Sequence, residues 1–187
     1  MRSRKISKWM ILFSIAILGG CTQVQDRSTL GSNPEPLMVF LVRHGEKVDQ
    51  SRDPELSSAG YVRAATLAHS LRNAQLHHVY SSAYIRTMKT AEPTAAIHGL
   101  KVEVYDPSDL KSLAEELRQK GGRHLVVGHS NTTPRLVQLL GGEPGSEIHE
   151  PDEYDRLYVL TIDGDGIVNT ILLRYGVPYI PDIQQLP

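Results

Sequence analysis

Arg43 and His44 are adjacent residues of the types that bind and transfer anionic groups, and Gly45 follows them. The apolar run Leu37–Phe40 before them has the length and the β-branched and aromatic content of a buried strand. Arginine supplies a fixed positive charge with several N–H donors, and a neutral imidazole is a nucleophile. The pattern therefore predicts a phosphate site at a strand end, although a turn with two solvated polar residues has the same pattern.

Two more candidate residues follow the ends of other predicted strands. The sequence predicts a strand over His77–Ser82, and Arg86 comes just after it, near the start of a helical stretch. It predicts another strand over Arg123–Gly128, with His129 directly after it and a helix beyond. Unpaired N–H groups and the helix dipole favour an anion at such a helix start. Each residue also has an ordinary interpretation, Arg86 as a surface arginine and His129 as a buried turn residue.

The elements that must position these residues alternate along the chain. Helical spacing of apolar residues predicts helices over Gly60–Arg72, Ala83–Ile97, Leu110–Lys120 and Leu136–Leu140. Further strands are predicted over Leu100–Tyr105, Arg156–Ile162 and Ile167–Arg174, the last two joined by a Gly-rich hairpin turn. This order predicts a three-layer α/β/α sandwich with a mostly parallel sheet and an antiparallel edge hairpin. The carboxyl ends of parallel strands share one edge, so the candidate residues are expected to meet there.

Several residues are expected to begin or interrupt these elements. Ser57 is a predicted helix cap, and the turn Asp106–Asp109 is predicted to cap the helix that follows. Ser130 or Asn131 is the candidate cap of the helix after His129. Pro93 is expected to kink or split the helix that contains it, because proline lacks the N–H that the helix needs.

The composition bounds the class of protein. The chain has 187 residues, of which 40% are hydrophobic and 22% charged, as expected for one globular domain with a full core. A formal net charge of -1 argues against bulk nucleic-acid binding. With a single cysteine, no internal disulfide is possible.

The adjacent His77 and His78 point to opposite faces of a strand and are a poor metal site.

The first 36 residues are expected to lie outside the fold. Four basic residues precede the short uncharged run Trp9–Leu18, which is typical of a secretory signal over residues 1–20. The only cysteine, Cys21, follows small residues and resembles the lipidated cysteine of bacterial lipoproteins; an ordinary signal peptide is the alternative. Residues 21–36 are then the lipidated cysteine and a flexible tether, residues 37–176 the domain, and residues 177–187 an irregular tail. The chain is expected to be exported and held at a membrane, facing the periplasm or the cell exterior.

Three segments together resemble the motifs of the histidine phosphatase superfamily, which includes the phosphoglycerate mutases. They are Leu41–Glu46, Tyr80–Ala91 and Val126–Ser130, and the resemblance extends from Leu37 to Arg174. The short chain without a large insertion resembles the branch of small phosphohistidine phosphatases and mutase-like proteins.

The resemblance implies a role for each central residue. His44 would attack phosphorus and become phosphorylated, Arg43 and Arg86 would bind the phosphoryl oxygens, and His129 would stabilise the transferring group. The carbonyl of Gly45 would fix the tautomer of His44. Positioning and charge stabilisation are what phosphoryl transfer mainly needs, and this set supplies them without a metal or cofactor.

The sequence leaves the general acid open. Acid phosphatases of the superfamily have an aspartate directly after the second histidine, where this chain has Ser130. Mutase-like members take a glutamate from the segment after the third strand, where Asp106 and Asp109 are the nearest carboxylates. Asp106 is the first candidate and Glu46, beside the nucleophile, the second. A turn and helix cap is the ordinary interpretation of Asp106 and Asp109.

Three functions fit these observations. The first is a metal-independent phosphatase acting on a small phosphorylated substrate or a phosphoprotein, by way of a phosphohistidine at His44. The second is a phosphoglycerate mutase-type phosphotransferase, which an export signal disfavours. The third is a non-catalytic phosphate-binding module on the same fold, which the retention of all four central residues disfavours. Loops Val48–Glu55 and Glu143–Asp155 are expected to line the pocket.

Overall fold

The computed structural model describes residues 35–150 and 152–181, so the signal, Cys21 and nearly all of the tether lie outside the described residues. The six strands are β1 (Leu37–Arg43), β2 (His78–Ser81), β3 (Val102–Val104), β4 (Gly122–Gly128), β5 (Arg156–Ile162) and β6 (Val168–Arg174). The four helices are α1 (Ser58–Leu71), α2 (Ile85–Ile97), α3 (Leu110–Lys120) and α4 (Thr132–Leu139).

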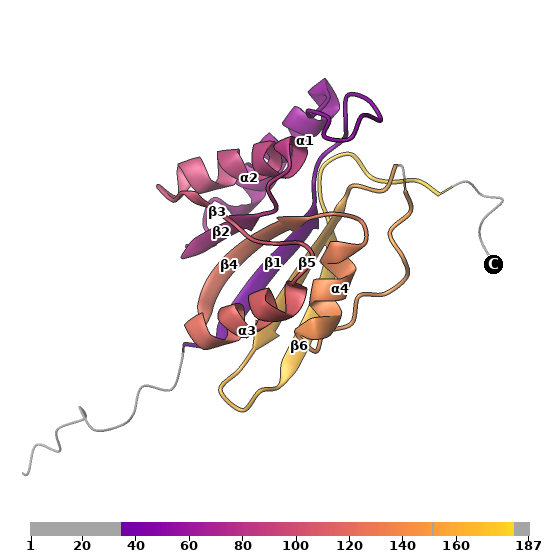
Figure 1. The fold of residues 1–187 in the computed structure, drawn as a ribbon. Helices are drawn as coiled ribbons and strands as arrows, with labels where there is room; N and C mark the ends of the chain where they lie inside the picture. Colours follow the sequence, from indigo (N-terminus) through magenta and orange to yellow (C-terminus); the bar gives the residue numbers. More distant parts are fainter. Residues whose placement is uncertain (1–34, 151, 182–187) are drawn as a thin grey trace, which may run out of the picture. The chain divides into compact units, whose positions relative to one another are not determined.

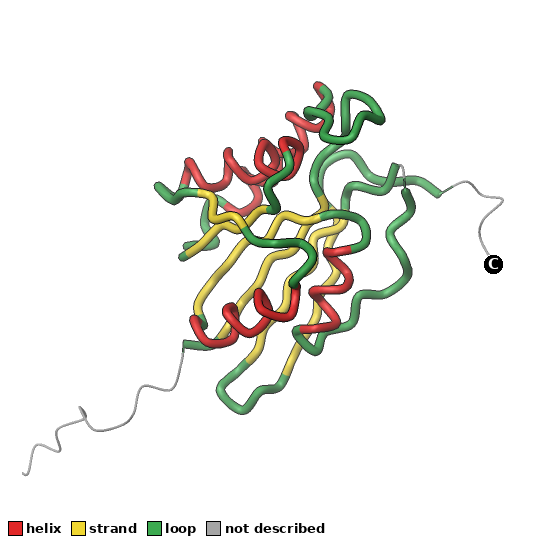
Figure 2. The backbone as a smooth tube through the Cα atoms, in the orientation of Figure 1, coloured by secondary structure: helices red, strands yellow, loops and turns green. Residues whose placement is uncertain are grey.

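All six strands form one mixed sheet in the order β3-β2-β4-β1-β5-β6. Strands β3, β2, β4 and β1 run parallel to one another, β5 is antiparallel to β1, and β6 is antiparallel to β5. Helices lie on both sides of the sheet, with α1 and α2 on one side and α3 and α4 on the other (Figures 1 and 2). The predicted α/β/α architecture with its antiparallel hairpin is confirmed.

Strand β1 is buried on both faces, which explains its unbroken apolar sequence. Val39 and Leu41 belong to the core that contains the apolar residues of α3 and α4. Phe40 and Val42 belong to the other core, which contains apolar residues of α1 and α2. The strand that leads to Arg43 is therefore fixed from both sides of the sheet.

Helices α1 and α3 begin where the capping residues predict. The hydroxyl of Ser57 accepts a hydrogen bond of 3.2 Å from the N–H of Gly60. The carboxylate of Asp109 accepts one of 3.2 Å from the N–H of Ser112. Helix α3 has the predicted bounds, and the four residues predicted on its apolar side are its buried ones: Leu110, Leu113, Ala114 and Leu117.

Three local predictions differ in part from the structure. Pro93 lies inside α2 without splitting it, and the turns around it are held by the buried residues Thr90, Ala91, Thr94 and Ala95. The strand predicted over Leu100–Tyr105 shortens to β3, which pairs only with β2. Asn131, one of the two predicted caps, is the N-cap residue of α4, but its side chain makes no cap hydrogen bond; the N–H of His129 donates to the Thr132 hydroxyl at 2.9 Å.

The registers of the parallel strands bring the predicted site residues to one edge of the sheet. Arg43, the last residue of β1, pairs with Gly128, the last residue of β4. Ser81, the last residue of β2, pairs with Val127. The residues that follow these strands are therefore neighbours in space.

Within the described part of the chain, no helix is long and apolar enough to cross a membrane.

Candidate active site

The four residues predicted from the strand ends come together. The rings of His44 and His129 meet edge to face, with centroids 5.4 Å apart. Nη2 of Arg86 lies 3.4 Å from Nδ1 of His129. His44, Arg86 and His129 line one cavity of about 510 Å³. Arg43 is buried beside it, since its exposed fraction is only 1%.

The main chain fixes the ring of His44 in one orientation. The main-chain N–H of His44 donates to the carbonyl of Gly128 at 2.9 Å, which continues the pairing of β1 with β4. Its ring Nδ1 lies 2.7 Å from the carbonyl oxygen of Gly45, as the resemblance implies. A carbonyl only accepts, so Nδ1 carries the proton and Nε2 keeps its lone pair.

Burial keeps the imidazole of His44 neutral. It lowers the pKa of His44 to about 2, with the hydrogen bond to Gly45 opposing and the charges of Arg43 and Arg86 adding to the effect. At neutral pH the ring is therefore unprotonated at Nε2. A neutral imidazole with a free lone pair in a cavity is a competent nucleophile.

Gly45 is required by close packing with helix α1. A Cβ added to Gly45 would lie 2.9 Å from the carbonyl oxygen of Gly60. A Cβ on Gly60 would lie 2.4 Å from the carbonyl oxygen of Glu46. The N–H of Gly45 also donates to the Thr90 hydroxyl of α2 at 2.9 Å. Helices α1 and α2 thus both hold the loop that carries the nucleophile.

His129 is placed by contacts on both sides of its ring. Its Nε2 lies 2.9 Å from the hydroxyl of Ser82, the residue after β2. The ring of Tyr84 meets it edge to face at 5.0 Å. Burial and the charges of Arg86 and Arg43 lower the pKa of His129 to about 4, so it too is neutral at pH 7.

The two arginines are held by tyrosines and carry unpaired N–H groups. The guanidinium of Arg43 lies 4.0 Å from the ring centre of Tyr154, and that of Arg86 lies 4.5 Å from the ring centre of Tyr84. In the described structure, Nε of each arginine is buried without a hydrogen-bond partner. Buried donors of this kind, on two guanidiniums beside two histidines, fit an anion such as phosphate.

A carboxylate that the sequence did not single out lies at the same cavity. Oε1 of Glu150 is 2.7 Å from Nη2 of Arg43, and Oε2 accepts a hydrogen bond from Ser130. The ammonium of Lys47 is 3.8 Å from the same carboxylate. Glu150 belongs to the acidic loop that was expected to line the pocket, and that loop does contribute to it. Position within the loop gave no signal that this glutamate, among several, would enter the site.

The two acids predicted from the sequence are not part of the cavity lining, although Pro107 and Ser108, which follow Asp106, are. The Asp106 carboxylate is exposed and accepts hydrogen bonds from the N–H and the hydroxyl of Ser108, as in the turn that was its ordinary interpretation. The Glu46 carboxylate pairs with Arg63 of α1, with an Nη2–Oε1 distance of 2.7 Å. Neither is among the residues that line the cavity. Their roles as general acids remain predictions.

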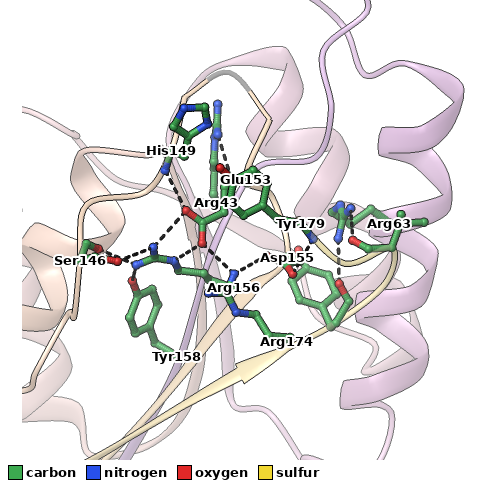
Figure 3. Close-up of polar contacts among 12 residues, drawn as sticks. Arg43, Arg63, Ser146, His149, Glu153, Asp155, Arg156, Tyr158, Arg174 and Tyr179 are labelled. Carbon is green, nitrogen blue, oxygen red and sulfur yellow. Dashed lines mark hydrogen bonds and ion pairs between the residues drawn. The ribbon is translucent and has the colours of Figure 1, made fainter. Parts of the chain in front are cut away.

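A buried network behind the site, which sequence analysis missed, anchors the acidic loop (Figure 3). The Glu153 carboxylate accepts from Nε of Arg156 at 2.6 Å and from Nη1 of Arg174 at 2.7 Å. Arg174 also binds Asp155 at 2.6 Å. The carbonyl of Glu153 accepts from Nη1 of Arg43 at 3.0 Å. The network therefore connects the hairpin of β5 and β6 to a candidate phosphate-binding arginine.

No three histidine, cysteine or carboxylate side chains in residues 35–150 and 152–181 are arranged to hold a metal ion. His77 and His78 contact different partners. Nδ1 of His77 lies 3.7 Å from Glu35, and Nδ1 of His78 lies 2.6 Å from Glu103. His78 also stacks on the buried His124, with centroids 5.2 Å apart.

A family model matches part of the chain. Residues 39–107 match the model of the histidine phosphatase superfamily, branch 1. The match spans fewer than half of the 187 residues, so over this part the chain is similar to the histidine phosphatase superfamily, and its sheet has the fold of a solved histidine phosphatase.

Two curated relatives match part of the chain. It is 27% identical over 130 residues to the probable phosphoglycerate mutase GpmB of Photorhabdus laumondii subsp. laumondii, which covers 66% of this chain and 59% of that protein. It is 32% identical over 108 residues to a probable phosphatase of Schizosaccharomyces pombe, which covers 52% of this chain and 38% of that protein. The chain therefore spans less than two thirds of the length of either relative.

Solved structures share the fold over most of the domain. The protein histidine phosphatase SixA, solved in complex with tungstate, superposes with a TM-score of 0.59 at 20% identity, covering 74% of this chain and 97% of that one. Phosphoglycerate mutase from Bacillus anthracis str. Sterne superposes with a TM-score of 0.58 at 14% identity, covering 75% and 94%. These likenesses show the fold that the sequence predicted.

The lowered pKa values of the site histidines predict a loss of stability in acid. Unfolded histidine titrates near pH 6.5, whereas His129 in the folded protein titrates near 4 and His44 near 2. The unfolded chain thus binds protons first, so stability falls as the pH drops below about 6.5 towards these values. We expect the melting temperature to fall between about pH 7 and pH 4.5, and to fall less in His129→Gln. Equal pH dependence in the wild type, His129→Gln and the exposed control His69→Gln would contradict this.

Proposed function

We propose that this protein is a metal-independent phosphatase that hydrolyses a phosphomonoester or phosphoramidate through a phosphohistidine at His44. The observation that carries the proposal is the fixed, neutral imidazole of His44, whose Nδ1 is bound to Gly45 and whose Nε2 remains available at the cavity. Arg43 and Arg86, with their buried unpaired Nε–H groups, supply donors for the phosphoryl oxygens.

The reaction proceeds in two transfers of one phosphoryl group. Nε2 of His44 attacks phosphorus, the bond to the leaving oxygen breaks, and a phosphohistidine forms. A water molecule then attacks the phosphohistidine, which releases inorganic phosphate and free His44. Charge on the transferring group is stabilised by Arg43, Arg86 and His129. With an anion bound, the Ser82 hydroxyl donates to Nε2 of His129 and leaves Nδ1 as a donor to phosphate.

A phosphoglycerate mutase-type transfer is the second candidate function, and the similarity to the probable phosphoglycerate mutase of Photorhabdus laumondii favours it. Both functions use the same phosphohistidine. They differ in whether water or a phosphoglycerate accepts the phosphoryl group.

Hydrolysis of para-nitrophenyl phosphate in the presence of EDTA tests the proposal. We expect turnover by the purified chain with release of inorganic phosphate. A panel of phosphoesters and phosphoramidates, including a phosphohistidine peptide, then ranks substrates by kcat/KM. Transfer between phosphoglycerates without phosphate release would identify a mutase instead. Absence of turnover on the whole panel would reject catalysis and favour a phosphate-binding module.

We also propose that the protein is an exported lipoprotein anchored through Cys21. The basic start, the short apolar run Trp9–Leu18 and the position of the single cysteine support this placement. A phosphatase outside the cytoplasm would meet phosphorylated molecules at the membrane or in the periplasm.

Replacing Cys21 by serine is expected to release the protein from membranes. The serine cannot carry the thioether-linked lipid, so the signal no longer yields an anchored product. Membrane and soluble fractions of the expressing bacterium, probed for the protein, give the measurement, with Thr22→Ser as the matched control. Unchanged membrane association of Cys21→Ser would contradict lipidation at this residue.

A further inference from the structure

We propose that Glu150 is the general acid that protonates the leaving oxygen, and that Ser130 holds it in position. The inference rests on the phosphatase function proposed above. It assigns the proton donor to the loop after α4 and not to the turn after β3.

Glu150 is at the cavity in a defined geometry. Among the described residues that line the cavity, it alone carries a carboxyl group. One oxygen lies 2.7 Å from Nη2 of Arg43 and the other accepts from Ser130, the residue directly after His129. Ser130 has no carboxyl group and cannot be the acid itself, but its hydroxyl fixes a carboxylate from twenty positions away in the sequence. That carboxylate therefore lies beside both a phosphate-binding residue and a site histidine.

The direction of attack leaves the proton donor at the cavity mouth. His44 attacks from the buried side, since its ring is only 3% exposed. In an in-line displacement the leaving oxygen departs opposite the nucleophile, which is towards solvent. The side chain of Glu150 is 48% exposed, so it lies on the open side and reaches an outgoing group.

The other carboxylates near the site have different partners. Asp106 binds Ser108, and Glu46 is paired with Arg63. Oδ1 of Asp53 accepts from the N–H of Ile85 at 3.0 Å, at the start of α2, and lies 3.5 Å from Nη1 of Arg86. None of these three carboxylates belongs to a residue that lines the cavity.

Substrate binding changes the charge that Glu150 faces. In the free site, burial raises the pKa of Glu150, but the Ser130 hydrogen bond and the charges of Arg43 and Lys47 outweigh this effect, so the pKa lies below its ordinary value. A dianionic phosphoryl group on Arg43 neutralises that guanidinium and sets like charge beside the carboxylate. Both changes raise the pKa of a carboxyl group, so Glu150 takes up a proton as the substrate binds.

The proton balance then closes over the two steps. As Nε2 of His44 bonds to phosphorus, the P–O bond to the leaving group breaks and the carboxyl proton of Glu150 passes to the departing oxygen. The resulting carboxylate accepts a proton from the attacking water. The new P–O bond forms while the P–N bond to His44 breaks, which leaves Glu150 protonated. As inorganic phosphate leaves, Arg43 again lowers the pKa of Glu150, and the carboxyl group releases its proton to solvent.

Rates on substrates with different leaving groups test this assignment. Glu150→Gln keeps a side chain that can bind Ser130 but cannot donate a carboxyl proton. We expect its kcat/KM for an alkyl phosphate such as glycerol phosphate to fall by about 10² to 10⁴-fold, with little change for para-nitrophenyl phosphate, whose leaving group needs no proton. The alkaline limb of the pH profile for the alkyl phosphate should also disappear. In Ser130→Ala, kcat/KM for the alkyl phosphate should also fall selectively, but by a smaller factor than in Glu150→Gln.

Two further variants make the outcome decisive. Glu147→Gln changes an exposed glutamate of the same loop and should behave as wild type on both substrates. Asp106→Asn tests the rival acid. A selective loss in Asp106→Asn and not in Glu150→Gln would overturn the proposal. So would equal losses on both substrates in Glu150→Gln, or a lower KM with unchanged leaving-group dependence, which would mark Glu150 as a competitor of phosphate. Failure of the wild type on every phosphoester would instead reject the phosphatase function itself.

Discussion

Replacing His44 by alanine is expected to abolish phosphoester hydrolysis, lowering kcat by about 10⁴-fold or more. The substitution removes the atom that forms the bond to phosphorus. His129 cannot replace it, because its Nε2 is bound to Ser82 and its Nδ1 carries the proton that it donates to phosphate. The remaining arginines still bind the phosphoryl group. The affinity for inorganic phosphate should therefore change much less than kcat does.

Protein quenched by denaturation at alkaline pH provides the direct measurement of this loss, because the P–N bond of a phosphohistidine hydrolyses in acid. Wild-type protein mixed with substrate should gain the mass of one phosphoryl group, and the label should map to the peptide that contains His44. His44→Ala should gain none, while His69→Ala, a change on the exposed side of α1, should react as the wild type does. A phosphorylated His44→Ala protein would place the nucleophile elsewhere and reject the proposed mechanism.

The sequence was sufficient to predict the residues at the strand ends because their signals are local. Arg43 and His44 follow an apolar run that only a two-face-buried strand accommodates, and His129 follows another. Once the strands are parallel, the register of β1 against β4 brings these ends together without further information. The same local logic located the caps at Ser57 and Asp109.

The partners of those residues were not predictable, because they come from distant segments. Glu150 reaches Arg43 across 107 positions and Glu153 across 110, through a loop that has no helix or strand period. Nothing in an acidic loop distinguishes a glutamate that enters the cavity from one that anchors the loop or faces solvent. Pro93 failed as a breaker for a related reason, since tertiary packing around α2 outweighed the local cost of one missing hydrogen bond.

Replacing Glu153 by glutamine is expected to destabilise the domain by about 3 kcal/mol, within the range for breaking one partner of a buried ion pair. The Glu153 side chain is 3% exposed and binds Arg156, which is 4% exposed. The neutral amide leaves the Arg156 guanidinium buried without its counter-charge, although Ser146 and Tyr158 still accept from it. For a domain of this size the melting temperature should fall by roughly 10 °C.

Thermal denaturation followed by circular dichroism measures this effect, and Glu147→Gln is the matched control because its side chain is exposed on the same loop. The double variant Glu153→Gln/Arg156→Met should be more stable than the sum of the single variants predicts, since it removes both buried charges together.

Arg43 depends on the carbonyl of Glu153 for its orientation, so the KM for phosphoesters should rise in Glu153→Gln even at temperatures where it is folded. A melting temperature within about 2 °C of the wild type would show that the network contributes little to stability. In that case, an unchanged KM would also mean that Arg43 is held by Tyr154 and Glu150 without help from Glu153.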